Sequence, residues 1–124
     1  MADPSTVPAS AAGTEILRRA TQNIASNSST VKLLDGVANH TYTILSIIFF
    51  NTSASDAEDV LMWLDGDGAG STERSIIDET IPAQSTFVWN DKFIMVGTDE
   101  LVARLDTGSG NVNTIISYIE QRWA

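Results

Sequence analysis

Residues 41–51, TYTILSIIFFN, decide the fold class of this chain. β-Branched and aromatic residues fill this stretch, and residues of these types favour β-strands. Simple alternation puts apolar side chains on both faces of the strand, with Tyr42, Ile44, Ile48 and Phe50 on one face and Leu45, Ile47 and Phe49 on the other. Strands that are apolar on both faces lie in the middle of a sheet. We therefore expect a central strand that is buried on both sides.

Similar short runs continue along the chain, separated by turn-forming residues such as Asp35-Gly36 and the segment DGDGAGS at 65–71. We expect strands over residues 29–34, 59–64, 74–81, 85–89, 93–96, 100–105 and 112–119. The connections are too short for crossover helices, so the sheets must be antiparallel. The pattern predicts an all-β fold, a single antiparallel β-sandwich of jelly-roll type with about eight strands.

The segment before these runs has two parts. Residues 14–24 fit either a strand or a helix, and the helix would place on one face Ile16, Leu17, Ala20 and Ile24. We prefer the strand because everything that follows is β. Residues 1–13 have almost no apolar bulk, so burial cannot offset their ordering entropy. A frayed tail is the default interpretation of such a segment. Our hypothesis is an extended N-terminal arm at 1–13, held by a neighbouring subunit or partner, before a β-sandwich domain at 14–124.

The composition argues against several classes of partner. The chain carries 16 acidic and 7 basic residues, for a net charge of −9. Binding to nucleic acid or to an anionic membrane requires clustered Lys and Arg, and only Arg18 and Arg19 are adjacent here. We therefore expect neither nucleic acid nor membrane as a partner. The chain has no cysteine and a single histidine, which excludes disulfides and metal sites built from Cys or several His ligands.

The sequence also bears on targeting. The first residues lack a basic region followed by an apolar run, so we expect no signal peptide. The most apolar stretch, residues 44–50, is too short to span a bilayer. We expect the protein to be made in the cytoplasm and to stay soluble.

Acidic residues raise two possible kinds of chemistry. Asp65 and Asp67 offer carboxylates to calcium in a glycine-rich loop, but the loop lacks the further acids of an EF-hand, and an acidic surface turn is the preferred interpretation. Adjacent acids on a strand, such as Asp78-Glu79, point to opposite faces and do not form a shared glycosidase site. No serine lies in a G-x-S-x-G elbow, and the glycine runs match no phosphate loop. We expect no catalytic residue, no metal and no cofactor, and hence no enzyme.

The aromatic residues bear on binding. Trp63, Phe87 and Trp89 alternate along strands, so we expect them in the core. Trp123 stands beside Arg122 after the last expected strand, and both residue types are enriched in interface hot spots. We predict that Arg122 and Trp123 bind a partner. The alternative is that Trp123 folds back over the sandwich.

Five sequence blocks together resemble small structural proteins of tailed-bacteriophage particles. They are SNSSTVKLL (26–34), YTILSIIFFNTSAS (42–55), TIPAQSTFVW (80–89), GTDELVARL (97–105) and IISYIE (115–120). The resemblance extends over residues 14–120 and rests on turns and buried strands. It implies a β-sandwich and a virion location, and it transfers no catalytic residue.

The resemblance implies a non-enzymatic role as a capsid decoration, or cement, protein on the capsid exterior, assembled in the host cytoplasm. The implied partners are the major capsid protein or other virion proteins. Repeated weak contacts would give avidity, and self-association, with a trimer favoured, would match a symmetry axis of the shell. The candidate clamp residues are Pro4, Val7, Pro8, Arg122 and Trp123. Alternatives are a neck-associated, tail-associated or fibre-linked adaptor, a carbohydrate-binding module at the tail and, last, a small hydrolase.

Overall fold

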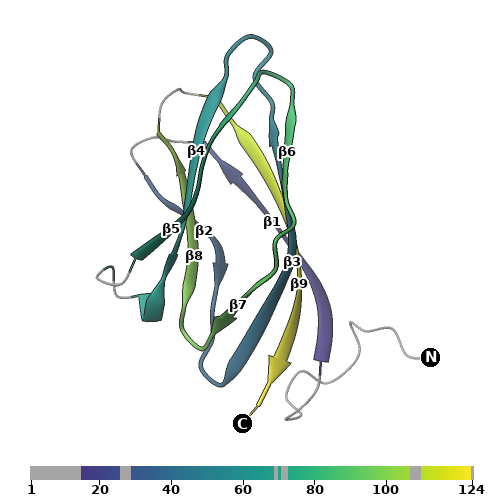
Figure 1. Ribbon diagram of the computed structural model, residues 1–124, viewed down its shortest axis with the longest axis vertical. Helices are drawn as coiled ribbons and strands as arrows, with labels where there is room; N and C mark the ends of the chain where they lie inside the picture. The colour runs from purple at the N-terminus through teal and green to yellow at the C-terminus, as the bar shows by residue number, and fades with distance from the viewer. Residues whose placement is uncertain (1–14, 26–28, 69, 71–72, 107–109, 124) are drawn as a thin grey trace, which may run out of the picture.

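The computed structural model describes residues 15–25, 29–68, 70, 73–106 and 110–123. Within these residues the chain forms 9 strands and no α-helix. The strands are β1 (Glu15–Ile24), β2 (Val31–Asp35), β3 (His40–Asn51), β4 (Glu58–Asp65), β5 (Glu73–Ile81), β6 (Thr86–Trp89), β7 (Phe93–Val96), β8 (Glu100–Leu105) and β9 (Val112–Arg122), with a short 3-10 turn η2 (Gly66–Gly68). They build two sheets that face each other (Figure 1).

All strand pairs are antiparallel. Sheet A has the order β1-β9-β3-β6, and β7 also pairs with β3, whereas sheet B has the order β2-β8-β4-β5. β6 and β7 pair with different halves of β3, so together they take one place in sheet A. This is the strand order of a jelly roll, and it confirms the predicted β-sandwich. The strand interpretation of the segment after the arm is confirmed as well, because β1 covers most of it.

A bulge in β3 changes which side chains enter the core. Along the ladder with β9, Ile44 pairs with Tyr118 and Ser46 pairs with Ser117, so Leu45 is left as an extra residue. An inserted residue reverses the alternation of side chains beyond it. The faces expected from simple alternation are therefore wrong after Leu45.

Ile47 and Phe49 consequently point into the core and are fully buried, together with Tyr42 and Ile44 from the first half of the strand. Ile48 and Phe50 turn outward, and they are 36% and 37% exposed. β3 does lie in the middle of sheet A, as expected. The expectation that it is buried on both sides is wrong, because no described residue covers the outer side.

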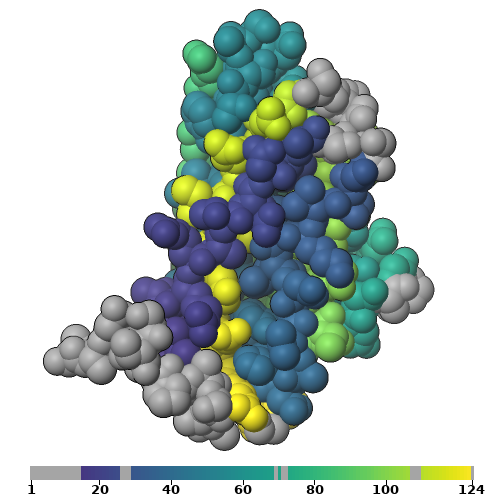
Figure 2. Space-filling model, turned by 180° about the vertical axis from the view of Figure 1, so that it is seen from behind, coloured from purple at the N-terminus to yellow at the C-terminus, as the bar shows by residue number. Residues whose placement is uncertain are grey.

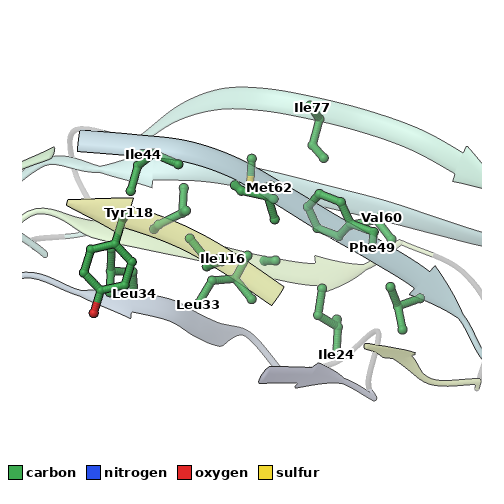
Figure 3. Close-up of a cluster of buried hydrophobic side chains, with 14 of the residues drawn as sticks. Ile24, Leu33, Leu34, Ile44, Phe49, Val60, Met62, Ile77, Ile116 and Tyr118 are labelled. Atoms are coloured by element: carbon green, nitrogen blue, oxygen red, sulfur yellow. The ribbon is translucent and has the colours of Figure 1, made fainter. Parts of the chain in front are cut away.

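The core lies between the two sheets (Figure 3). Both sheets contribute fully buried side chains, including Ile44, Phe49 and Ile116 from sheet A and Val60, Met62 and Leu101 from sheet B. Phe87 and Trp89 pack against this core, as predicted. Removal of this apolar surface from water is the main term that stabilises the fold.

Asn51, the last residue of β3, is a polar side chain inside this apolar environment, with no exposed surface. Its Nδ2 donates to the backbone oxygens of Asp56 and Ile81, both at 2.9 Å. Its Oδ1 accepts from the Ser53 N–H, also at 2.9 Å. The side chain thus ties the β3–β4 connection to the end of β5, and it satisfies the hydrogen bonds that a buried amide requires.

Gly36 lies at the other end of the sandwich, where the β2–β3 and β7–β8 connections meet (Figure 1). Its N–H donates to the Asp99 carbonyl at 2.9 Å. A Cβ atom at this position would collide with the backbone oxygens of Gly97 and Asp99. The two connections therefore approach each other as only a glycine permits.

Two buried tyrosines predict a pH dependence of stability. Burial raises the pKa of both Tyr42 and Tyr118 above the ordinary value of 10.0. Below pH 10.0 both phenols are neutral in the folded and unfolded chain, so their contribution to stability is complete; at higher pH the unfolded chain ionises first and stability falls. The two tyrosines can be titrated by their phenolate absorbance. We expect the midpoint to lie above pH 10.0 in the folded protein and near the ordinary pKa of 10.0 in denaturant. Ionisation at the ordinary pKa in the folded protein would contradict their burial.

Candidate interaction surface

The outer side of sheet A gathers apolar side chains. Among the described residues, every exposed large hydrophobic side chain except Val37 falls on it or, in the case of Trp123, at its border. We call this surface the apolar face and define it by Leu17, Ile48, Phe50, Val88, Ile94, Val96, Ile115 and Trp123. Exposed apolar clusters of this kind mark interaction sites on soluble proteins.

Strand pairing brings these residues together from distant parts of the sequence. Ile115 of β9 lies opposite Ile48 of β3, which in turn lies opposite Val88 of β6. Phe50 follows two residues after Ile48 on the same side of β3. These four side chains form one continuous apolar patch across three strands.

A second patch lies at the other end of the same strands. Its members Leu17 of β1 and Ile94 of β7 share one row of the sheet with Ile119 and Thr43 between them. Val96 lies two residues after Ile94, on the next outward row. The row of Arg19, Ser117 and Ser46 separates the two patches.

Charge is nearly absent from the apolar face. The outward positions of β3, β6, β7 and β9 hold no charged side chain. Glu15 and Arg19, both on β1, are the charged side chains that the described ladder places there. In a chain with 16 acidic residues this is an uneven distribution. Protein interfaces are likewise depleted of charge at their centre.

The outer side of sheet B is acidic instead. Asp35, Glu100, Asp65 and Glu73 form one row across its four strands. Lys32 Nζ lies 3.0 Å from Glu100 Oε2 and 3.9 Å from Asp35 Oδ2. The pKa of Lys32 is raised above its ordinary value, mainly by the hydrogen bond to Glu100 and next by the negative charge of Asp35. The two outer surfaces of the sandwich therefore differ in chemistry.

The carboxylates considered for calcium have protein partners. Asp65 is buried, and its Oδ1 accepts from the Gly70 N–H at 2.9 Å. Thr98 Oγ1 donates to Asp67 Oδ1 at 3.5 Å, and the N–H of Asp67, which has a positive φ of 58°, donates to Asp99 Oδ1 at 3.0 Å. In the part of the chain that the structure describes, no group of three or more acidic, His or Cys side chains is placed to hold a metal ion. The described hydrogen bonds of both aspartates therefore lie within the protein.

Trp63 occupies a different place from the one expected. It alternates with the core residue Met62 and lines an open groove of about 430 Å³ on the outer side of sheet B. Leu61, Ser75 and Arg104 also line this groove. The prediction of a core position for Trp63 is wrong, because β4 turns the side that carries Val60 and Met62 to the core and the side that carries Trp63 away from it.

The predicted partner-binding residues fall into two groups. Pro4, Val7 and Pro8 lie outside the described residues. Arg122 ends β9 opposite His40, and Trp123 follows it, 52% exposed, with its N–H donating to the Asn39 carbonyl at 3.0 Å. By alternation with Gln121, Trp123 borders the apolar face, whereas Arg122 turns the other way.

No helix of the described residues has the length and apolarity needed to cross a membrane.

Comparisons with known proteins show the fold and no family. Neither a protein-family model nor a curated protein matches the chain. The structure is similar to a chain of the Bacillus endospore appendages, a family of disulfide-linked pili, with 10% identity over 92% of this chain and 93% of that chain and a TM-score of 0.56. A chain from the capsid of Helicobacter pylori bacteriophage KHP30 matches with 7% identity, coverages of 90% and 94% and a TM-score of 0.56. PirA matches with 8% identity, coverages of 81% and 92% and a TM-score of 0.53.

Proposed function

We propose that this chain is a non-enzymatic structural protein of a phage particle, which binds the capsid lattice and stabilises it as a decoration protein. The observation that carries the proposal is the apolar face, a broad surface with few charged side chains on an otherwise acidic molecule. The similar fold of a phage capsid chain supports a setting in a virion. The resemblance of the sequence blocks to phage structural proteins supports the same setting.

The size of the outer side of sheet A, which carries the apolar face, suits this role. Sheet A places four strands side by side, about 4.8 Å apart, and its long strands advance about 3.3 Å per residue. Its outer side therefore measures roughly 600–700 Å² in projection, close to the roughly 800 Å² that each partner buries in a standard protein interface. Such a surface can hold one specific contact with a capsid subunit.

In this proposal the chain sits on the capsid exterior, after assembly in the host cytoplasm, with the apolar face against the major capsid protein or another virion protein. The acidic side of sheet B then faces solvent. The arm at 1–13, with Pro4, Val7 and Pro8, adds a second attachment, and Trp123 extends the apolar face at its border. Several such weak contacts on one shell give high avidity.

The test measures binding to capsids assembled from the major capsid protein of the same phage. Val88→Lys and Ile94→Lys each place a charge on the apolar face at side chains that are 48% and 57% exposed, so the fold will tolerate them. We expect each change to weaken binding at least about tenfold, because a buried unpaired charge is costly at an interface.

Val37→Lys is the matched control, because Val37 is 53% exposed but lies off the apolar face. It should bind like the unchanged protein. Equal binding by all three variants would remove the apolar face from the proposal. A chain without residues 1–13 tests the arm in the same assay, with weaker binding as the expected result.

The same surface would serve a neck-associated, tail-associated or fibre-linked adaptor, and binding to purified tails in place of capsids would favour that role. The groove at Trp63 supports the other alternative, a carbohydrate-binding module. The groove offers a stacking surface, the Trp63 indole, and polar groups, the Ser75 hydroxyl and the Arg104 guanidinium. A change in tryptophan fluorescence on adding host glycans, abolished by Trp63→Ala, would favour it.

A further inference from the structure

β1 leaves one backbone edge of sheet A without a partner strand. Its register with β9 runs without a shift from Glu15 opposite Gln121 to Ile24 opposite Val112, and no other described strand pairs with it. The end strands of sheet B are less regular, since β2 and the β4–β5 pair each contain a register shift. In Figure 2, β1 (purple) runs down the molecule and no other described strand lies over it. A long regular edge is a ready template for another strand.

The side chains on the outer side of β1 are self-complementary. Glu15 and Arg19 lie two residues before and two residues after Leu17, so all three point to the same side. Leu17 is 61% exposed, more than any other exposed large hydrophobic residue among those described. Within the described chain, neither Glu15 nor Arg19 has a side-chain hydrogen bond or ion pair. The strand thus carries an acid and a base at equal distances from an exposed apolar residue.

We propose that two copies of this chain associate by antiparallel pairing of their β1 strands around a two-fold axis at Leu17. In this register Leu17 lies opposite the partner's Leu17. Glu15 lies opposite the partner's Arg19, and the same pair repeats on the other side of the axis. Opposite charges directly across an antiparallel pair stabilise it.

Other registers lose this complementarity. A parallel pairing in register places Glu15 opposite the partner's Glu15, and like charges opposite each other are destabilising. An antiparallel pairing displaced by two residues leaves both ion pairs unmade. The charge pattern therefore selects one arrangement. The two ion pairs also offset part of the repulsion between copies that each carry a net charge of −9.

The pairing gives a two-fold dimer in place of the trimer expected from the resemblance. Sheet A becomes continuous across the two copies, and their apolar faces lie side by side. The pairing uses the backbone edge of β1, and although Leu17 also belongs to the apolar face, the pairing does not require capsid binding.

A single engineered cysteine tests the register. The chain has no cysteine, so Leu17→Cys introduces one thiol per copy. Opposite residues of an antiparallel pair have Cα atoms about 4.5–5.5 Å apart, which lies within the roughly 4.4–6.8 Å that a disulfide requires. Under mild oxidation we expect Leu17→Cys to convert almost completely to a covalent dimer.

Thr21→Cys is the matched control, on the same strand and the same side of the sheet. In the proposed register the two copies of residue 21 lie roughly 26 Å apart, so this variant should remain monomeric under the same oxidation. Equal and slow crosslinking of the two variants would overturn the register.

Charge reversal gives a second readout without cysteines, by sedimentation of the whole chain over a range of concentrations. Glu15→Arg or Arg19→Glu alone should weaken the dimer roughly tenfold, because each puts like charges opposite each other at two places. The double variant restores both pairs with reversed polarity and should dimerise like the unchanged protein. A double variant as weak as the single ones would contradict the proposal.

The outcomes separate this inference from the proposed function. A protein that forms the disulfide dimer but ignores capsids contradicts the decoration role alone. A protein that binds capsids while its Leu17→Cys variant stays monomeric contradicts the β1 pairing alone.

Discussion

Replacing Asn51 by alanine will lower the free energy of unfolding by about 3 kcal/mol. The change removes two donors from the backbone oxygens of Asp56 and Ile81 and one acceptor from the Ser53 N–H. Ile81 is itself buried, so water cannot replace the lost donor there. A buried polar group without a partner costs about 1–3 kcal/mol. Urea unfolding followed by tryptophan fluorescence will measure the loss.

Asn23→Ala is the matched control for this prediction. Asn23 also uses its Nδ2 as a donor, to Asn113 Oδ1 at 2.7 Å, but the pair is exposed to solvent. Water replaces the lost partner, and we expect a loss below about 0.5 kcal/mol. An equal loss of unfolding free energy in the two variants would show that the buried hydrogen bonds of Asn51 stabilise the fold no more than an exposed one.

Replacing Gly36 by alanine will lower the free energy of unfolding by about 3 kcal/mol or more. The added methyl group would overlap the backbone oxygens of Gly97 and Asp99, and no side-chain rotation can move a backbone atom away. The clash also strains the hydrogen bond from the Gly36 N–H to Asp99. Thermal unfolding by circular dichroism will report the change as a lower midpoint.

Gly70→Ala separates this clash from the general cost of replacing a glycine. Gly70 has a positive φ of 75°, and no atom lies within 4 Å of the position that an added Cβ would take, so its substitution introduces backbone strain alone. We expect a loss of about 1 kcal/mol for it. If Gly36→Ala costs no more than Gly70→Ala, the two connections can move apart and the close contact is not required.

The fold class could be predicted from the sequence because its signals are local. β-Branched and aromatic runs separated by Asp, Gly and Pro turns mark strands and their ends wherever the chain later places them. The segment of β1 fitted a helix as well, and the context of surrounding strands decided correctly for a strand. Phe87 and Trp89 were placed in the core for the same local reason, their alternation along β6.

The faces of β3 could not be predicted, because the bulge at Leu45 is a property of its pairing with β9. One extra residue exchanged Ile47 and Phe49 with Ile48 and Phe50 between core and surface. Trp63 was misplaced because alternation along a strand does not say which side faces the other sheet.

The apolar face could not be predicted from the sequence for a related reason. Ile115, Ile48 and Val88 are far apart in the sequence and become neighbours only through the order of strands in sheet A. Trp123 was singled out from its residue type and its place beside Arg122 after the last expected strand, and it borders this surface. Alternation along β7 was a usable signal for part of this face. Phe93 and Met95 point to the core, so Ile94 and Val96 had to point outward. The partner-binding roles of Pro4, Val7, Pro8, Arg122 and Trp123 stay predictions.

The interruption between β6 and β7 limits how far pairing through the edges of sheet A can extend. The edge of sheet A opposite β1 consists of two pieces of 4 residues each, with the exposed charges of Asp91 and Lys92 between them. An incoming strand would find no continuous ladder there and would meet both charges. If both edges of sheet A could pair, copies would add without end and form fibrils, whereas pairing through β1 alone stops at a closed pair. Pairing through the edges of sheet A therefore stops at two copies.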